Sequence, residues 1–275
     1  MDNIEIVKRL TKVNSEEIHV SDDGFLSTGY VIRNGEIIFK FKKHPDVSYE
    51  NEIRLLDFLN SENLNVNLQR VGWISPDDSY VGLYGVKGKA AEHLSLSDEE
   101  KLSVGSQLGV FLKKLHSLSP DHTGSFSVEE EISAWQERFL KSAKIMTEYF
   151  TSEEMEKLHS FVFEKAPKEL TALGEKQVFS HADLGEGNIF LDDNGKVGVI
   201  DFNESAYADE AADFMDIEDD SICNALLEAY GADDTLREKV KIRRLIRPLF
   251  VIETYSQRGQ KAVEKYIDRI RQTLL

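Results

Sequence analysis

The sequence lacks the features of a secreted or membrane-spanning chain. It has one cysteine, Cys223, so an internal disulfide is impossible. It has no run of about 20 apolar residues, the length that a membrane-spanning helix needs. Residues 1–5 do not form a basic segment followed by an apolar one, as a secretory signal would. We therefore expect a cytoplasmic protein without a membrane partner.

Proline and basic side chains are also scarce. There are 5 prolines in 275 residues, with no low-complexity tract and no repeat at a fixed period, so any boundary between lobes is expected to be short and ordered. The 33 lysines and arginines are outnumbered by 50 aspartates and glutamates, which gives a formal charge of −17. Such a field repels nucleic acids and attracts cations, although acidity serves solubility equally well. No nucleic-acid partner is expected.

The sequence does contain enough hydrophobic residues, 41%, to bury a substantial core, and its length suits two lobes. Strand patterns occupy residues 18–41, 71–74 and 80–86, and a helical pattern occupies residues 48–59. They predict a five-stranded antiparallel sheet with one helix. From residue 96 onward the pattern is mainly helical, and we interpret His116 only as a group near a helix end.

The stretch at residues 178–205 carries the polar groups that chemistry requires. A polar loop leads into apolar residues 189–191, a turn, and a return through residues 197–200, which together predict a β-hairpin. The hairpin should bring Asn188 close to Asp201, and both offer the hard oxygen atoms that bind Mg²⁺ on nucleotide phosphates. The alternative is a surface loop before an ordinary hairpin, which four polar positions in order make less favourable.

A His-x-Asp-x-x-x-x-Asn motif at residues 181–188, followed by Ile-Asp-Phe at residues 200–202, resembles the catalytic signature of the aminoglycoside phosphotransferase and choline kinase families. These are small-molecule relatives of the protein kinases. The resemblance implies an α+β, two-lobed protein-kinase-like fold. Its N-terminal nucleotide-binding lobe would span residues 1–86, and a mainly helical lobe with the catalytic loop and acceptor site would span residues 87–275.

The resemblance also implies roles for individual residues. Asp183 stands at the position of the catalytic base, which takes the proton of the acceptor hydroxyl. Asn188 and Asp201 stand at the positions of the Mg²⁺ ligands. His181 is expected to brace the loop, and Asp213 matches a structural aspartate that supports it.

Lys40 lies late in a strand, where burial habits alone favour solvent exposure. However, residues 51–56 resemble the helix of aminoglycoside 2″-phosphotransferases in which a glutamate orients the phosphate-binding lysine. We therefore expect Lys40 to pair with Glu52, with Glu50 as the alternative partner. Such a pair fixes the ammonium group where it can neutralise nucleotide phosphates.

Two further segments are expected to contact the nucleotide. The loop at residues 21–29, which includes Ser27, holds small hydroxyl and glycine residues that suit phosphates. Residues 80–88 resemble the hinge of the same phosphotransferases, where backbone groups around Tyr84 and Val86 would bind a purine. Because backbone groups read the base, the sequence does not distinguish ATP from GTP.

The acceptor site is the least defined part of the resemblance. Glu204 and Asp219 stand where the 2″-phosphotransferases have carboxylates that face the aminoglycoside amines, and Glu253 is a further candidate. In contrast, residues 239–247 are basic where acids and aromatic residues are expected. If these cations face the acceptor, a polycationic substrate is disfavoured; if they face solvent or acidic helices, nothing follows.

The sequence thus predicts transfer of the terminal phosphoryl group of ATP or GTP, with Mg²⁺, to a hydroxyl of a small, cationic acceptor. An aminoglycoside is the first choice, with resistance as the biological role, and choline, another amino alcohol or a sugar is the alternative. A nucleotide-binding regulator with a degenerate kinase fold is the alternative from another class, but every position checked carries a competent residue. Residues after Asp201 show no activation segment of a protein kinase. A monomer or weak dimer is expected.

Overall fold

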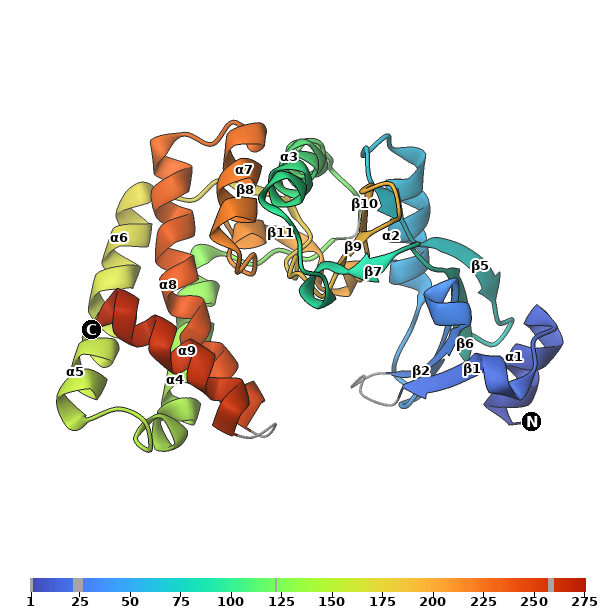
Figure 1. The fold of residues 1–275 in the computed structure, drawn as a ribbon, viewed down its shortest axis with the longest axis horizontal. Helices are drawn as coiled ribbons and strands as arrows, with labels where there is room; N and C mark the ends of the chain where they lie inside the picture. The colour runs from blue at the N-terminus through green and yellow to red at the C-terminus, as the bar shows by residue number, and fades with distance from the viewer. Residues whose placement is uncertain (1, 22–26, 122, 257–259) are drawn as a thin grey trace.

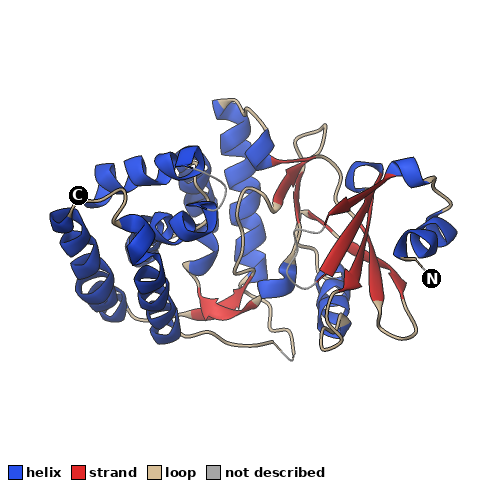
Figure 2. Cartoon of the chain, turned by 90° about the horizontal axis from the view of Figure 1, so that it is seen from below, coloured by secondary structure: helices blue, strands red, loops and turns tan. Residues whose placement is uncertain are grey.

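The computed structural model describes residues 2–21, 27–121, 123–256 and 260–275. A strand-rich part and a helical part lie at opposite ends of the long axis, and the two termini lie near those ends (Figure 1). Seen from below, the largest sheet lies at one end, smaller sheets lie toward the middle, and only helices occupy the other end (Figure 2). The expected α+β organisation is confirmed.

The N-terminal end is a five-stranded antiparallel sheet in the order β1-β2-β3-β6-β5. Aromatic side chains of β2, β3 and β6 fill one face and pack against α1, whose Val7 is fully buried. The amphipathic spacing of α1 explains this packing, because its apolar side chains share one face. The strands are β1 (Ile18–Ser21), β2 (Ser27–Ile32), β3 (Ile37–Lys42), β5 (Arg70–Ile74) and β6 (Tyr80–Tyr84), and the helices are α1 (Asn3–Thr11) and α2 (Glu50–Ser61).

The predicted hairpin is present as β9 (Ile189–Leu191) and β10 (Val197–Val199), with Gly195 at φ 72° in the turn. The hairpin is the centre of a four-stranded sheet, β4-β10-β9-β7. Its edges, β4 (Asn67–Leu68) and β7 (Lys89–Ala90), are only two residues long, too short for a periodic pattern. The hairpin therefore pairs with the segment just before β5 and with the segment just after β6.

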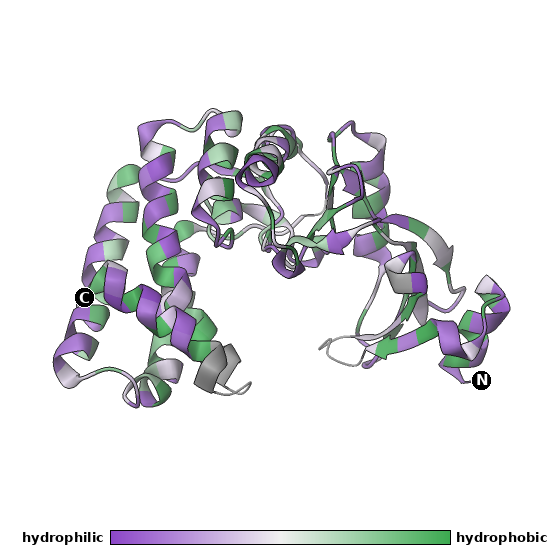
Figure 3. Cartoon of the chain, in the orientation of Figure 1, coloured by the Kyte–Doolittle hydropathy of each residue, from purple (hydrophilic) through white to green (hydrophobic). Residues whose placement is uncertain are grey.

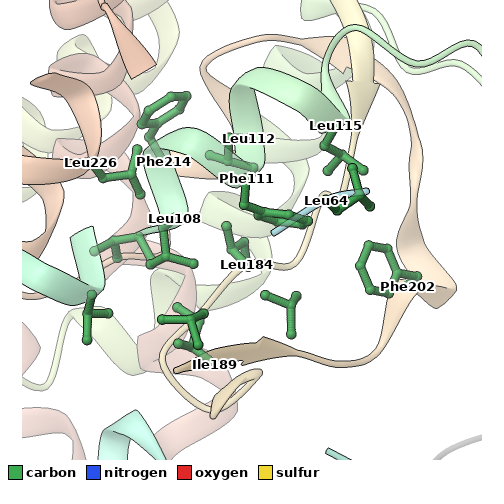
Figure 4. Close-up of a cluster of buried hydrophobic side chains, with 14 of the residues drawn as sticks. Leu64, Leu108, Phe111, Leu112, Leu115, Leu184, Ile189, Phe202, Phe214 and Leu226 are labelled. Carbon is green, nitrogen blue, oxygen red and sulfur yellow. The ribbon is translucent and has the colours of Figure 1, made fainter. Parts of the chain in front are cut away.

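Two helices, α3 (Asp98–Leu115) and α7 (Asp220–Tyr230), cross at close range behind the hairpin. A Cβ atom on Gly105 would lie 2.4 Å from the carbonyl oxygen of Ile222, and one on Gly109 would lie 2.5 Å from that of Leu226. Glycine is therefore required at both positions. Apolar side chains of α3 then meet those of the loop after β8, of the turn at residues 212–214 and of α7, including Leu108, Phe111, Leu184, Phe214 and Leu226 (Figure 4).

The helical end has its own core, in which Trp135 stacks near Phe250 with ring centroids 6.3 Å apart. Along α8 and α9 hydrophilic and hydrophobic residues alternate, as expected of helices with one buried face (Figure 3). The helices are α4 (Val128–Met146), α5 (Ser152–Ser160), a π-helical segment (Phe161–Lys165), α6 (Ala166–Leu173), α8 (Asp234–Ser256) and α9 (Gln260–Leu274). In the described ranges, no helix combines the length and apolar character needed to cross a membrane.

The remaining elements connect these parts. A two-stranded antiparallel sheet joins the segment before the catalytic loop to the segment after the hairpin. Its strands are β8 (Gln177–Ser180) and β11 (Ala206–Asp209). Short 3₁₀ turns are Ser15–Glu17, Arg33–Gly35, Ala91–His93, Phe202–Glu204 and Ala212–Phe214. The boundary after residue 86 stays a prediction, although the segment with β4 pairs with the catalytic hairpin.

Candidate active site

The loop between β8 and β9 is held by the buried carboxylate of Asp213. Its oxygens accept hydrogen bonds from the backbone N–H groups of His181, at 3.0 Å, and Ala182, at 2.7 Å. Ala182 has φ 65°, a left-handed conformation that costs energy for a residue with a Cβ atom. The His181 ring donates from Nε2 to the carbonyl oxygen of Ile200, 2.9 Å away. Asp213 and His181 thus fix the loop from its two sides.

The loop presents Asp183 beside Asn188. The Asn188 amide nitrogen donates to the Asp183 carbonyl oxygen at 2.8 Å and to its carboxylate Oδ2 at 3.0 Å. Burial of the carboxyl, together with the nearby negative charge of Asp216, raises the pKa of Asp183. The side chain is therefore oriented and is a better proton acceptor than a free aspartate.

The hairpin register brings Asn188 to Asp201. Val199 pairs with Ile189, and the Ile200 N–H donates to the Asn188 carbonyl oxygen at 3.0 Å. Asp201 has φ 65°, and its N–H donates to Oε1 of the buried Gln69 at 3.4 Å. The backbones of Asn188 and Asp201 are therefore neighbours at the open end of the hairpin, and their side chains are of the amide and carboxylate types that supply hard oxygen donors to Mg²⁺.

Lys40 on β3 and Glu52 on α2 form an ion pair of 2.6 Å, with 18% and 10% of the side chains exposed. Glu50, the alternative partner, instead pairs with Arg54 at 2.9 Å on the solvent side of α2. The direction of α2 explains the choice, because Glu50 and Glu52 lie on different faces of a helix. A fixed cation therefore faces the cleft under the sheet.

These groups line a cavity of about 1170 Å³, which we name the first cavity. Its lining includes Lys40, Glu52, Asp183 and Asp201. Two predicted residues also line it: Ser27, whose hydroxyl lies 2.9 Å from that of Tyr49, and the exposed Glu204. Residues 22–26 of the predicted phosphate loop lie outside the described residues.

A smaller cavity of about 230 Å³, the second cavity, lies on the other side of the catalytic loop. Asp183 and Asn188 line it together with residues of α8 and α9. Two basic residues of the segment 239–247, Arg244 and Arg247, face this cavity. Of the others, Lys239 and Arg243 are buried in ion pairs with Asp209, at 2.8 and 3.2 Å, and Lys241 pairs with Glu238 on the surface.

Of the predicted residues whose side chains are described, Val86, Tyr84 and Asp219 line neither cavity, and neither do the bracing residues His181 and Asp213. Val86 packs against Gly198, where a Cβ atom would lie 2.0 Å from it. The ring of Tyr84 lies against Trp73, with centroids 5.0 Å apart. The purine contacts expected of the backbone groups at Tyr84 and Val86 stay a prediction. Asp219 accepts hydrogen bonds at the N-terminus of α7 and pairs with Lys101 at 2.8 Å. Glu253 lies in α8, but its side chain is outside the described part.

Sequence reasoning missed His116. Its Nε2 lies 3.0 Å from Oδ2 of Asp213, and its Nδ1 lies 3.0 Å from the hydroxyl of Tyr230. The histidine therefore supports the carboxylate that supports the catalytic loop. The spacing of residues 116 and 213 gave no signal of this contact, because it depends on the crossing of α3 with the segment before α7.

The sheet with its Lys40–Glu52 pair, the braced loop with Asp183 and the hairpin with Asp201 define a kinase-like phosphotransferase. A family model described as "Phosphotransferase enzyme family" matches residues 19–242. Since this is most of the chain, the protein belongs to that family.

Solved structures show the same fold at low sequence identity. The GDP and kanamycin complex of APH(2″)-IIIa superposes with a TM-score of 0.73 at 17% identity, covering 98% of this chain and 96% of that one. ADP-bound APH(2″)-Ib gives 0.68 at 20% identity, covering 99% and 98%. The macrolide 2′-phosphotransferase MphH from Brachybacterium faecium gives 0.63 at 16%, covering 96% and 95%. The kinase-like fold and the similarity to aminoglycoside 2″-phosphotransferases are confirmed.

Proposed function

We propose that the chain transfers the terminal phosphoryl group of Mg²⁺-bound ATP or GTP to a hydroxyl group of a small molecule. The observation that carries the proposal is the position of Asp183, which lines both cavities. The first cavity offers Lys40 and Asp201 to a nucleotide, and the second offers space beside the same carboxylate to an acceptor. A direct transfer requires that both substrates meet at the base.

Asp183 would orient the acceptor hydroxyl and take its proton as the hydroxyl oxygen attacks the terminal phosphorus. The new O–P bond forms as the bond between that phosphorus and the bridging oxygen breaks, which releases the nucleoside diphosphate. Lys40, held by Glu52, contributes positive charge toward the phosphates. The raised pKa of Asp183, caused by burial and by Asp216, favours proton acceptance.

Asn188 and Asp201 would hold the metal ion. Mg²⁺ typically takes one or two protein oxygens and completes its shell with phosphate oxygens and water. In keeping with this, the described residues contain no cluster of three or more His, Cys, Asp or Glu side chains that would bind a metal without a nucleotide. When bound, the ion neutralises phosphate charge.

The acceptor class is proposed from the structural comparisons. Similar folds occur in the gentamicin complex of APH(2″)-IIa and in the kanamycin complex of APH(2″)-IIIa, which supports an aminoglycoside as the first acceptor to test. The nucleotides in these relatives include ATP, ADP and GDP, so either purine remains a candidate donor. Choline, another amino alcohol and a sugar stay as alternatives.

The test is release of nucleoside diphosphate by the purified protein, with ATP and GTP separately, against aminoglycosides, choline and sugars. Release that depends on one acceptor and yields a phosphorylated product is the expected result. Binding of Mg²⁺-nucleotide without transfer to any acceptor would contradict the proposal and favour a nucleotide-binding regulator. Release of nucleoside diphosphate that is unchanged when Asp183 is substituted would contradict it as well.

A further inference from the structure

The walls of the second cavity carry opposite charges. On one side stand the carboxylates of Asp183 and Glu186 in the catalytic loop and that of Glu92 in the turn after β7. On the opposite side, α8 contributes Arg244 and Arg247, and α9 contributes Arg269. Guanidinium groups stay protonated at all physiological pH values, so this side is permanently cationic.

The carboxylates on the helical side already have partners. The Asp216 carboxylate accepts a charged hydrogen bond from Arg247 Nε. Glu218 is engaged by the ammonium group of Lys265 and by the hydroxyl of Tyr266, the latter at 2.9 Å. Neither carboxylate is therefore available to an ammonium group of a ligand without losing an existing partner, which is costly for a buried charge.

The arginines, in contrast, retain donors. Arg244 uses one nitrogen, Nη2, for the Asp220 carboxylate at 2.8 Å and the Glu218 carbonyl at 3.0 Å, while its buried Nε has no hydrogen-bond partner in the described structure. Within the described ranges, the half-buried side chain of Arg269 forms no hydrogen bond and no ion pair. Its charge interacts electrostatically with that of Glu218. Because the Nε of Arg244 is shielded from solvent, the unused donors open to this cavity are those of Arg269, and they indicate a ligand acceptor.

The size of the cavity also limits the ligand. Its volume of about 230 Å³ is below the range of roughly 300–1,000 Å³ typical of sites for drug-sized ligands. Met215, Pro248 and Val251 give it an apolar wall beside the arginines. A compact molecule with one anionic end fits these walls better than a polyamine of several rings.

We propose that the acceptor of this phosphotransferase carries an anionic group, a carboxylate or a phosphate, that binds Arg244 and Arg269 while its hydroxyl lies at Asp183. This assignment rests on the proposed phosphoryl transfer and replaces its first acceptor candidate, an aminoglycoside, with an anionic hydroxyl compound. Planar guanidinium groups bind both anions through paired hydrogen bonds, so the two sources share one chemistry. The anion also holds the hydroxyl in one orientation, which a single hydroxyl contact does not do.

The test compares four probes with similar carbon skeletons: gluconate, glucose 6-phosphate, glucose and glucosamine. Binding is measured by calorimetry on the full chain with Mg²⁺ and ADP present, so that the result does not depend on turnover. We expect one or both anionic probes to bind at least about tenfold more tightly than glucose, as charge-assisted hydrogen bonds imply. Glucosamine should bind no more tightly than glucose. Comparing gluconate with glucose 6-phosphate identifies the anion.

Variants of Arg269 locate the interaction. Arg269→Gln should remove the preference for the anionic probe, by about tenfold in Kd, and Arg269→Lys should restore part of it. Arg271→Gln is the matched control, because Arg271 lies on the same helix but pairs with Glu154 away from the cavity. Affinity for ADP should not change in any of the three variants.

Two results overturn the assignment: tightest binding of glucosamine, or no binding of either anionic probe. A preference for an anion that persists unchanged in Arg269→Gln overturns it as well. The proposed function fails on different grounds, namely absence of phosphoryl transfer to any acceptor, so the two failures are distinguishable. Anion binding without transfer would retain the cavity assignment and reject the reaction.

Discussion

The two cavities that share Asp183 are built in different ways. The first draws on one β-hairpin, one loop and the Lys40–Glu52 ion pair between β3 and α2, so its polar groups are fixed by strand register, by hydrogen bonds to the loop backbone and by one side-chain ion pair. The second draws on helices near the end of the chain, and its polar groups are fixed by ion pairs between side chains, such as Arg247 with Asp216. Most of the proposed catalytic groups therefore lie within one short stretch of sequence, residues 181–201, whereas the groups of the second cavity come together through the packing of helices.

A buried network of ion pairs lies between α8, which lines the second cavity, and α4. The Arg243 guanidinium is fully buried and binds Glu131 of α4 through Nε at 2.9 Å and Nη2 at 2.7 Å. It also approaches Asp209 at 3.2 Å, and Asp209 pairs with Lys239. The network fixes α8 against α4 and therefore sets the position of the arginines at the cavity.

The largest expected effect separates chemistry from binding. Asp183→Asn should lower kcat by roughly 10²–10⁴-fold, the usual contribution of a general base, while the Kd for Mg²⁺-nucleotide changes little. An amide keeps the shape of the side chain but does not take a proton. Steady-state kinetics and calorimetry on the same preparation check this. Retained turnover would remove Asp183 from the role of base.

Breaking the ion-pair network between α8 and α4 should lower the free energy of unfolding rather than affect the chemical step directly. Arg243→Met leaves the Glu131 and Asp209 carboxylates short of a buried partner, which typically costs about 3–5 kcal/mol of unfolding free energy. Urea unfolding measures the loss. The exposed Lys241→Met on the same helix is the matched control, and it should change stability by less than about 0.5 kcal/mol. A similar loss in both variants would show that the network adds nothing specific.

On the side of the first cavity, Glu52→Gln should weaken the hold on Lys40 without altering the acceptor side. Loss of one charge-assisted hydrogen bond, worth about 1.5–3 kcal/mol, corresponds to roughly a 10- to 150-fold rise in KM for the nucleotide. The matched control is Glu50→Gln, because Glu50 pairs with Arg54 at the surface. An equal rise in the acceptor KM would mean that the two cavities are not independent.

Local features could be predicted from the sequence. The turn at residues 192–195 and the flanking apolar residues defined the hairpin, and its register then placed Asn188 near Asp201. The five-stranded sheet was also predicted, because its strands are long enough to show a pattern. The Lys40–Glu52 pair was expected from the resemblance, and the structure shows that Glu50 faces elsewhere.

Features that depend on contacts between distant segments could not be predicted. The edge strands β4 and β7 have two residues each, so their pairing with the hairpin left no periodic signal. Asp219 was expected at the acceptor from the resemblance to the 2″-phosphotransferases, and the structure shows that it caps α7 and pairs with Lys101. The partner of Arg247 lies on another segment, and charge alone did not indicate which basic residues face the cavity.

The smallest expected effect concerns His116, which lies within hydrogen-bond distance of the Asp213 carboxylate that holds the loop at residues 181–182. His116→Phe keeps a ring of similar size but removes the hydrogen bonds to Asp213 and Tyr230, which should cost about 1–3 kcal/mol of stability for buried polar groups. Tyr230→Phe removes only the outer hydrogen bond and serves as the matched variant, with an expected loss of about 0.5–1.5 kcal/mol. If Asp213 transmits the effect to the loop at Ala182, kcat should fall several-fold in His116→Phe and stay within twofold in Tyr230→Phe. Equal kcat in both variants would show that the two backbone N–H groups alone hold Asp213 in place, and that His116 contributes only to the packing of α3.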